Sequence, residues 1–141
     1  MRRINRRSIL TALAGATALL TGRAQAAPAD DRRRAFIAQA FAMKQRAIDS
    51  GDQAFGAIVV RGDEIVGWGP SRVVLKKDWT AHAEREAIRD AKARLGRDDL
   101  SDCVMYSTSP PCSDCRLAAA QARIARMYAG ADAADLGPPR R

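Results

Sequence analysis

The chain has 141 residues, 47% of them hydrophobic, and its 24 Lys and Arg residues against 16 Asp and Glu residues leave a net charge of +8. This length suffices for one domain with a core of its own and leaves little room for a second. Residues 1–26 contain five arginines and no acid, so residues 27–141 hold 19 basic and 16 acidic residues, a net charge of +3. This near balance of charge argues against a strongly basic surface that binds nucleic acid. Three cysteines are too few for a fold held together by disulfide bonds.

Residues 1–26 have the pattern of an export signal. Arginines at residues 2–7 precede the apolar run ILTALAGATALL at 9–20, and AQA at 24–26 supplies small residues for cleavage. The run is short for a bilayer span, and NRRSIL at residues 5–10 resembles a twin-arginine motif. We therefore expect a twin-arginine-type signal peptide at 1–26, recognition by the twin-arginine export machinery, and a periplasmic or otherwise exported domain at 27–141. The alternative is a membrane anchor formed by an uncleaved signal.

The remaining residues alternate between helical and strand patterns. Apolar residues recur at helical spacing over 32–50, and Gly51 ends this helix. Apolar runs at 54–60 and 64–68 flank a turn at 61–63, which predicts a β-hairpin. After a loop at 69–78, Thr80 is the expected N-cap of a helix that runs to Leu95 and stops at Gly96. A third strand at 103–107, an alanine-rich helix at 112–125 and a fourth strand at 126–129 follow. The expected fold class is α/β, a three-layer α/β/α sandwich with a mixed sheet.

Two short segments carry metal-binding chemistry. HAE at 82–84 opens the second predicted helix and contains the only histidine of the chain, and PCSDC at 111–115 opens the third helix. One imidazole, from His82, and two thiolates, from Cys112 and Cys115, suit a zinc ion with one position left for water. The two cysteines are three residues apart on one side of a helical turn, and a helix N-terminus lowers thiol pKa values. Glu84 is placed as the base that takes a proton from the water.

H-x-E followed by P-C-x-x-C is a known zinc deaminase signature, and neighbouring residues extend the match. FGAIVV at 55–60, DWTAHAE at 78–84, MYS at 105–107 and PCSDC at 111–115 resemble the cytidine deaminase-like superfamily, especially its cytosine, guanine and tRNA-adenosine deaminase branch. The order of predicted elements agrees with that family's fold. The resemblance implies one zinc ion per chain held by His82, Cys112 and Cys115, and a proton shuttle at Glu84 during hydrolytic removal of an exocyclic amine. It also implies a homodimer, because relatives often complete the pocket across a subunit interface.

The positions that read the substrate depart from that family. Ser71 stands where many relatives have Asn, and Pro110 stands where guanine and adenosine deaminases have Glu. The chain also ends soon after its fourth predicted strand, where relatives usually add a further strand or helix. The resemblance places substrate contacts at Phe55, Ser71, Trp79 and Ala81 without identifying the base or nucleoside.

These observations predict a zinc-dependent hydrolase that deaminates a free nucleobase or nucleoside of the cytosine, guanine or adenine type. Deamination within RNA or DNA is the first alternative, but the net charge of +3 and the absence of a basic stripe with aromatic residues make nucleic acid an unexpected partner. A zinc-stabilised binding domain without activity is the second, favoured by the missing Asn and the early end of the chain. A redox disulfide between Cys112 and Cys115 is the third, although redox motifs require no H-x-E segment. Cys103 is expected as a buried strand residue.

Overall fold

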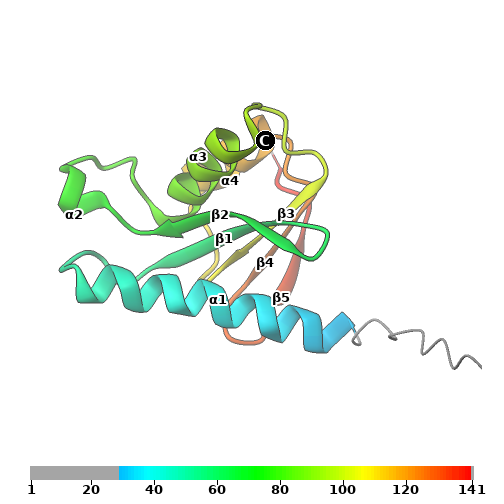
Figure 1. Cartoon of the computed structure of the whole chain (residues 1–141), viewed down its shortest axis with the longest axis horizontal. Coiled ribbons are helices and arrows are strands. Elements are labelled where there is room, and N and C mark those ends of the chain that lie inside the picture. The colour runs from blue at the N-terminus through cyan, green and yellow to red at the C-terminus, as the bar shows by residue number, and fades with distance from the viewer. Residues whose placement is uncertain (1–28, 141) are drawn as a thin grey trace, which may run out of the picture.

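A five-stranded sheet with helices on both faces forms the domain (Figure 1). The computed structural model describes residues 29–140, so the expected signal peptide at 1–26 lies outside the described residues. The helices are α1 (Ala29–Asp49), α2 (Val73–Lys76), α3 (Ala83–Leu95) and α4 (Ser113–Gln121), and the strands are β1 (Gly56–Arg61), β2 (Glu64–Pro70), β3 (Cys103–Ser107), β4 (Arg126–Ala129) and β5 (Ala134–Gly137).

The sheet is mixed and has the strand order β2-β1-β3-β4-β5. Strand β1 is antiparallel to both β2 and β3, β3 is parallel to β4, and β4 is antiparallel to β5. The parallel pair requires a crossover connection, which α4 supplies. Because Gly56 pairs with Pro70 and Ala57 pairs with Ser107, the start of β1 meets the ends of β2 and β3 at one edge of the sheet. The segments that leave these strand ends are thereby brought together.

Side chains of β1 alternate between two cores. Ile58 and Val60 face α1, whereas Ala57 and Val59 face α3 and α4, as the two-residue period of a strand requires. On the first face α1 buries Ile37, Ala40, Met43 and Ala47, and Tyr106 stacks on Tyr128 with ring centroids 4.8 Å apart. Helices on both faces confirm the three-layer sandwich expected from the sequence.

Two glycines allow α3 to lie directly against β2. A Cβ atom at Gly67 would overlap the carbonyl oxygen of Ala87, and one at Gly69 would overlap the carbonyl oxygen of Ala83. Close backbone approach of this kind is a common reason for glycine inside a strand. The first turn of α3, which carries Glu84, is consequently seated on the sheet.

Two elements were absent from the sequence expectation. Strand β5 adds a fifth strand beyond β4, and its residues, Ala-Asp-Leu-Gly, include no β-branched or aromatic side chain that would have revealed it. Helix α2 interrupts the segment expected to be a loop at 69–78, and at four residues it is too short to show helical periodicity.

Three helix boundaries also differ from the expectation by more than one residue. Helix α1 begins at Ala29 rather than at residue 32. Helix α3 begins at Ala83 with His82 as its N-cap, so Thr80 is not the cap; its hydroxyl instead donates to Asp78 and accepts from Arg89. Helix α4 ends at Gln121 rather than at residue 125, because Arg123 turns the chain into a left-handed conformation with φ of 65° ahead of β4.

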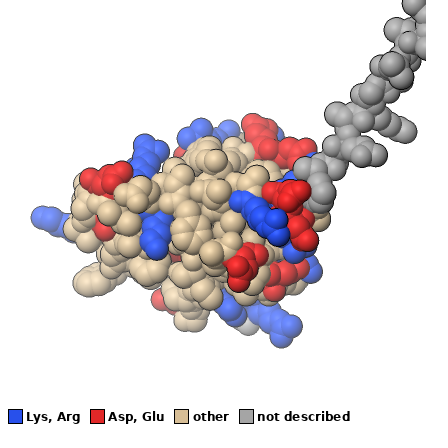
Figure 2. Space-filling model, turned by 90° about the horizontal axis from the view of Figure 1, so that it is seen from below, with Lys and Arg blue, Asp and Glu red and all other residues tan. Residues whose placement is uncertain are grey.

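The face formed around α1 carries interspersed Lys, Arg, Asp and Glu side chains rather than a field of one sign (Figure 2). Among residues 29–140, no helix is long and apolar enough to cross a membrane.

Candidate metal centre and cavity

Two helix starts bring the H-x-E and P-C-x-x-C segments together. His82 is the N-cap of α3 and Cys112 is the N-cap of α4, both with extended backbone and without a side-chain capping hydrogen bond. Their side chains are therefore free to project from the helix ends, and Cys115 follows in the first turn of α4. The positive ends of both helix dipoles point to this place, which favours thiolate and carboxylate groups.

The distances among the three side chains match a zinc site. The Nδ1 atom of His82 lies 3.4 Å from Sγ of Cys115 and 3.7 Å from Sγ of Cys112, and all three atoms fall within 4.8 Å of one another. Tetrahedral zinc with its usual Zn–N and Zn–S bond lengths separates nitrogen from sulfur by about 3.6 Å. The donor set fits a zinc ion with three protein ligands, which is the number found in catalytic rather than structural sites.

The charge state of the Cys115 thiol depends on whether a cation is bound. Burial and the neighbouring Glu84 carboxylate raise the pKa of the Cys115 thiol. Without a positive ion this thiol would keep its proton, and a bound divalent metal inverts that preference.

Glu84 lies in the first turn of α3 and is only 6% exposed. Burial raises the pKa of Glu84 above its usual value, while hydrogen bonding, including one from Cys115, and the charge of His82 act in the opposite direction. A buried carboxyl group with a raised pKa holds a proton more readily than an exposed one and can pass it on. Its place beside the His82 and Cys115 side chains is that of an acid–base group.

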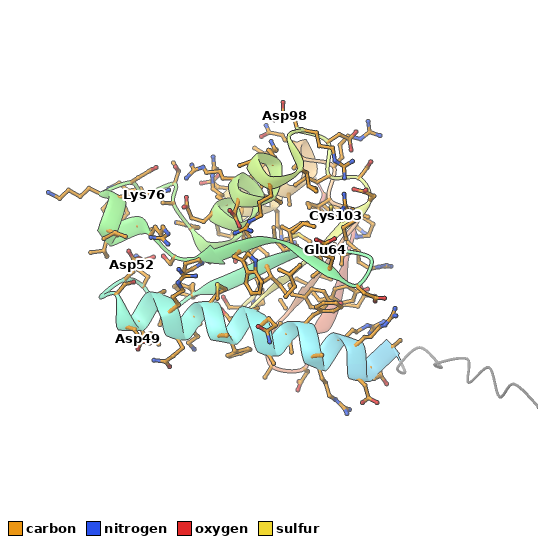
Figure 3. All side chains as sticks on the ribbon, viewed as in Figure 1. Asp49, Asp52, Glu64, Lys76, Asp98 and Cys103 are labelled. Atoms are coloured by element: carbon orange, nitrogen blue, oxygen red, sulfur yellow. The ribbon has the colours of Figure 1, made fainter. Side chains whose placement is uncertain are left out.

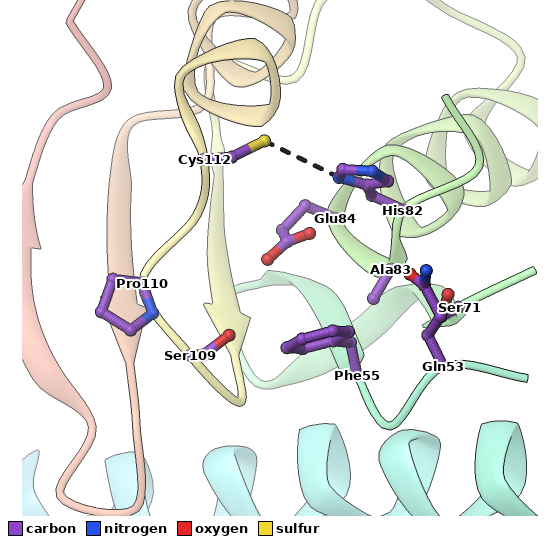
Figure 4. A pocket seen from close by; sticks show the side chains of 9 residues that line it. All are labelled: Gln53, Phe55, Ser71, His82, Ala83, Glu84, Ser109, Pro110 and Cys112. Carbon is purple, nitrogen blue, oxygen red and sulfur yellow. Dashed lines mark hydrogen bonds between the residues drawn. The ribbon is translucent and has the colours of Figure 1, made fainter. Parts of the chain in front are cut away.

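A cavity of about 160 Å³ opens beside this cluster. Figure 4 shows its walls, with Glu84, His82 and Cys112 on one side and Phe55, Ser71 and Gln53 across from them. The sheet edge described above supplies these residues, since Phe55 precedes β1 and Ser71 follows β2.

The four expected substrate contacts divide into two groups. Phe55, which is 45% exposed, and Ser71, which is buried, line the cavity as expected of substrate contacts. Ala81 is fully buried and does not line it. Trp79 is 82% exposed and lines a separate apolar hollow with Val73 and Val74, so within one chain it lies outside the cavity.

Three further residues line the cavity that the sequence had not indicated: Gln53, Ala83 and Ser109. Pro110, which the sequence places at a substrate-reading position, lines the cavity as well. Ala83 is adjacent to two motif residues and could have been inferred from them. Gln53 and Ser109 reach the site because the segments beside them meet: the Thr108 amide donates to the Gly56 carbonyl oxygen at 3.0 Å, and the Gly56 amide donates to the Thr108 hydroxyl oxygen at 3.2 Å. No local pattern marks such residues.

Comparison with known families assigns the fold and the metal site to one class. Residues 30–131 match the cytidine and deoxycytidylate deaminase zinc-binding region. The chain therefore belongs to this deaminase family, and zinc is the cofactor of the domain.

The similar proteins include deaminases of two kinds. The guanine deaminase of Bacillus subtilis is 40% identical over 86 residues, which are 59% of this chain and 55% of the relative. The tRNA-specific adenosine deaminase of Aquifex aeolicus is 37% identical over 92 residues, 65% of this chain and 61% of the relative. The crystal structure of the Bacillus subtilis guanine deaminase superposes with a TM-score of 0.66 at 34% identity, covering 69% of this chain and 62% of that one. The chain thus spans about three fifths of the length of these two curated relatives.

Proposed function

We propose that the domain catalyses zinc-dependent hydrolytic deamination of a free nucleobase or nucleoside, with His82, Cys112 and Cys115 as the zinc ligands and Glu84 as the proton shuttle. One observation carries this proposal: a buried carboxyl group stands beside a His-Cys-Cys cluster at the wall of a cavity. A structural zinc site would have four protein ligands and no need of a neighbouring acid–base group.

The chemistry replaces an exocyclic amine by oxygen. A zinc ion in a site with an open position supplies a water molecule whose pKa is lowered towards neutrality. The water oxygen forms a bond to the ring carbon, the bond from that carbon to the amine nitrogen breaks, and ammonia leaves. Glu84 accepts a proton from the attacking water and returns it to the departing nitrogen, so one carboxyl group serves as base and then as acid.

The dimensions of the cavity favour a small substrate. Its volume of about 160 Å³ is below the roughly 300–1,000 Å³ of sites that enclose drug-sized ligands. Phe55 supplies an aromatic side chain at the wall, which suits a flat heterocycle. A single base fits these properties better than a whole nucleotide enclosed in the cavity.

Ammonia release from a panel of bases, nucleosides and oligonucleotides tests the proposal. Zinc-loaded protein is expected to release ammonia from at least one free base or nucleoside, and protein stripped by a chelator is expected to release none. Release from oligonucleotides alone would transfer the activity to nucleic acid. A zinc-loaded protein that releases ammonia from no compound would be a binding domain rather than an enzyme.

Deamination within RNA is the second candidate, and Trp79 is the observation that favours it. Its ring is 82% exposed beside an apolar hollow that shares Gln53 with the main cavity. An exposed aromatic ring can stack on a base that neighbours the reacting one. Replacing Trp79 with Ala would then reduce ammonia release from an oligonucleotide and leave release from a free base unchanged.

Two further proposals concern assembly and location. We propose a homodimer, supported by the exposed apolar side chains of Phe55, Val74, Leu75 and Trp79 near the cavity; light scattering of the zinc-loaded protein tests it. We also propose export through the twin-arginine pathway, supported by NRRSIL at residues 5–10. That pathway carries folded proteins, so zinc could be bound before the thiols meet an oxidising compartment.

A further inference from the structure

The Ser71 hydroxyl at the wall of the cavity has its only proton engaged. Ser71 is 1% exposed and lines the cavity. Its Oγ atom donates a hydrogen bond to Oδ1 of Asp52 at 3.0 Å. A serine hydroxyl has one proton and two lone pairs, so only the lone pairs are left for a molecule in the cavity.

Asp52 keeps Ser71 as the donor of their shared hydrogen bond, which leaves the hydroxyl oxygen only its lone pairs for a ligand. Its carboxylate also accepts hydrogen bonds from the backbone amides of Gln53 at 2.8 Å and Leu75 at 2.9 Å, where the end of α1 approaches α2 (Figure 3). Burial acts to raise the pKa of Asp52, but the hydrogen bonds from Leu75, Gln53 and Ser71 together lower it. An ionised carboxylate has no proton to give, so the shared proton belongs to Ser71.

The backbone gives Ser71 little freedom to turn away. Its amide donates to the carbonyl oxygen of Phe55 at 3.1 Å, which joins the segment after β2 to the segment before β1. The two walls of this part of the cavity are therefore linked, and the position of the Oγ atom is set by three hydrogen bonds around Asp52 and one at the Ser71 backbone.

We propose that Ser71 is a hydrogen-bond acceptor for the substrate, kept in that role by Asp52, and that the site selects amino-substituted heterocycles that carry a second N–H donor besides the amine to be removed. This inference rests on the proposed deaminase function. If a ring presented a carbonyl oxygen or an unprotonated ring nitrogen to Ser71, two hydrogen-bond acceptors would face each other with no proton between them. The buried acceptor would stay unpaired, which lowers the binding affinity. The Asn that many relatives have at this position offers both a donor and an acceptor, so the Ser71–Asp52 pair makes the site more restrictive.

Ligand pairs that differ in one N–H donor test the proposal. We would use 2,4-diaminopyrimidine with 4-amino-2-methylpyrimidine, 2,6-diaminopurine with 2-methyladenine, and guanine with 2-amino-6-methoxypurine. The first two pairs replace an amine by a methyl group of the same size, and the third removes a ring N–H. Dissociation constants are measured by calorimetry on the zinc-loaded full chain carrying Glu84→Gln, so that no ligand is consumed.

The expected result is a change in preference rather than in overall affinity. The member of a pair with the extra donor should bind about three- to tenfold more tightly, as one neutral hydrogen bond allows. Adding Ser71→Ala should bring that ratio close to one while the donor-poor member keeps its affinity. Adding Asp52→Ala should reduce the ratio part of the way, because the released hydroxyl can then donate into the cavity. Asp49→Ala, which removes an exposed carboxylate that accepts from Gln45, is the matched control and should leave the ratio unchanged.

Three outcomes would overturn the inference. If Ser71→Ala leaves every ratio unchanged, Ser71 does not receive a hydrogen bond from these ligands. If Ser71→Ala weakens both members of each pair equally, the residue has only a structural role. If bases bind but every acceptor-rich partner binds more tightly than its donor-rich counterpart, the polarity is the reverse of that proposed. Failure of all six compounds to bind the zinc-loaded chain would refute the proposed function itself, and the inference with it.

Discussion

Replacing Glu84 with Gln separates the proton shuttle from the metal ligands. Gln has the same length and can fill the same space, but it cannot accept a proton. Because a positioned acid–base group contributes about 10²–10⁴ in rate, ammonia release should fall by that factor, which corresponds to about 3–5 kcal/mol of barrier. Glu84 is 6% exposed, and burial raises its pKa because the charged form is disfavoured there. The neutral amide removes that penalty, so the melting temperature of the metal-free protein should stay the same or rise.

His82→Ala should behave differently, because it removes one of three protein ligands. Zinc content should drop, and since metal binding contributes to folding free energy, the melting temperature of protein prepared with zinc should drop as well. Glu64→Gln is the matched control, an exposed carboxylate on β2 paired with Arg61 at 3.5 Å, and should change neither property.

The assays are ammonia release, zinc per chain by atomic absorption, and thermal unfolding followed by circular dichroism. Full activity in Glu84→Gln would refute the assignment of the proton shuttle. Loss of zinc from Glu84→Gln as severe as from His82→Ala would show instead that Glu84 is a ligand, and the division of roles argued above would be wrong.

Three other changes test the fold, the metal site and the export signal. Alkylation at mildly alkaline pH, followed by mass spectrometry, should modify the exposed Cys112 only after zinc is chelated. Cys103 and Cys115 are buried, and burial raises the pKa of both thiols, so both should stay unmodified in the folded protein. Reaction of Cys112 before chelation would contradict the site. Gly69→Ala should lower the free energy of unfolding in urea by about 1–3 kcal/mol, because the added Cβ atom overlaps the backbone of α3. An unchanged urea midpoint would mean that α3 packs less closely on β2. Replacing Arg6 and Arg7 together with Lys should keep the protein in the cytoplasm with residues 1–26 attached. Maturation of this variant outside the membrane would argue for an ordinary secretory route.

Much of the fold was predictable because its main elements are marked by local chemistry. The β-branched run of β1, the short apolar run of β3, the turn at 61–63 and the stop at Gly96 each act over a few residues, and the structure has them where the sequence predicts to within two residues. Helix α2 was missed because four residues are too few for a helical period to emerge, and strand β5 was missed because Ala-Asp-Leu-Gly contains no β-branched or aromatic residue.

By itself the sequence determined the candidate metal chemistry. One imidazole, two thiols and one carboxyl group in two short motifs restrict the possible metal and its role, because ligand type and number decide what zinc can do. The tertiary structure alone decided which further residues line the cavity. Gln53 and Ser109 belong to separate segments that meet Ser71 because β1 pairs with both β2 and β3 at one sheet edge. The polarity of Ser71 likewise depends on Asp52, which is 19 residues away in the chain. Hydrogen bonds between distant segments depend on strand register and helix packing, and no local pattern of residues encodes them.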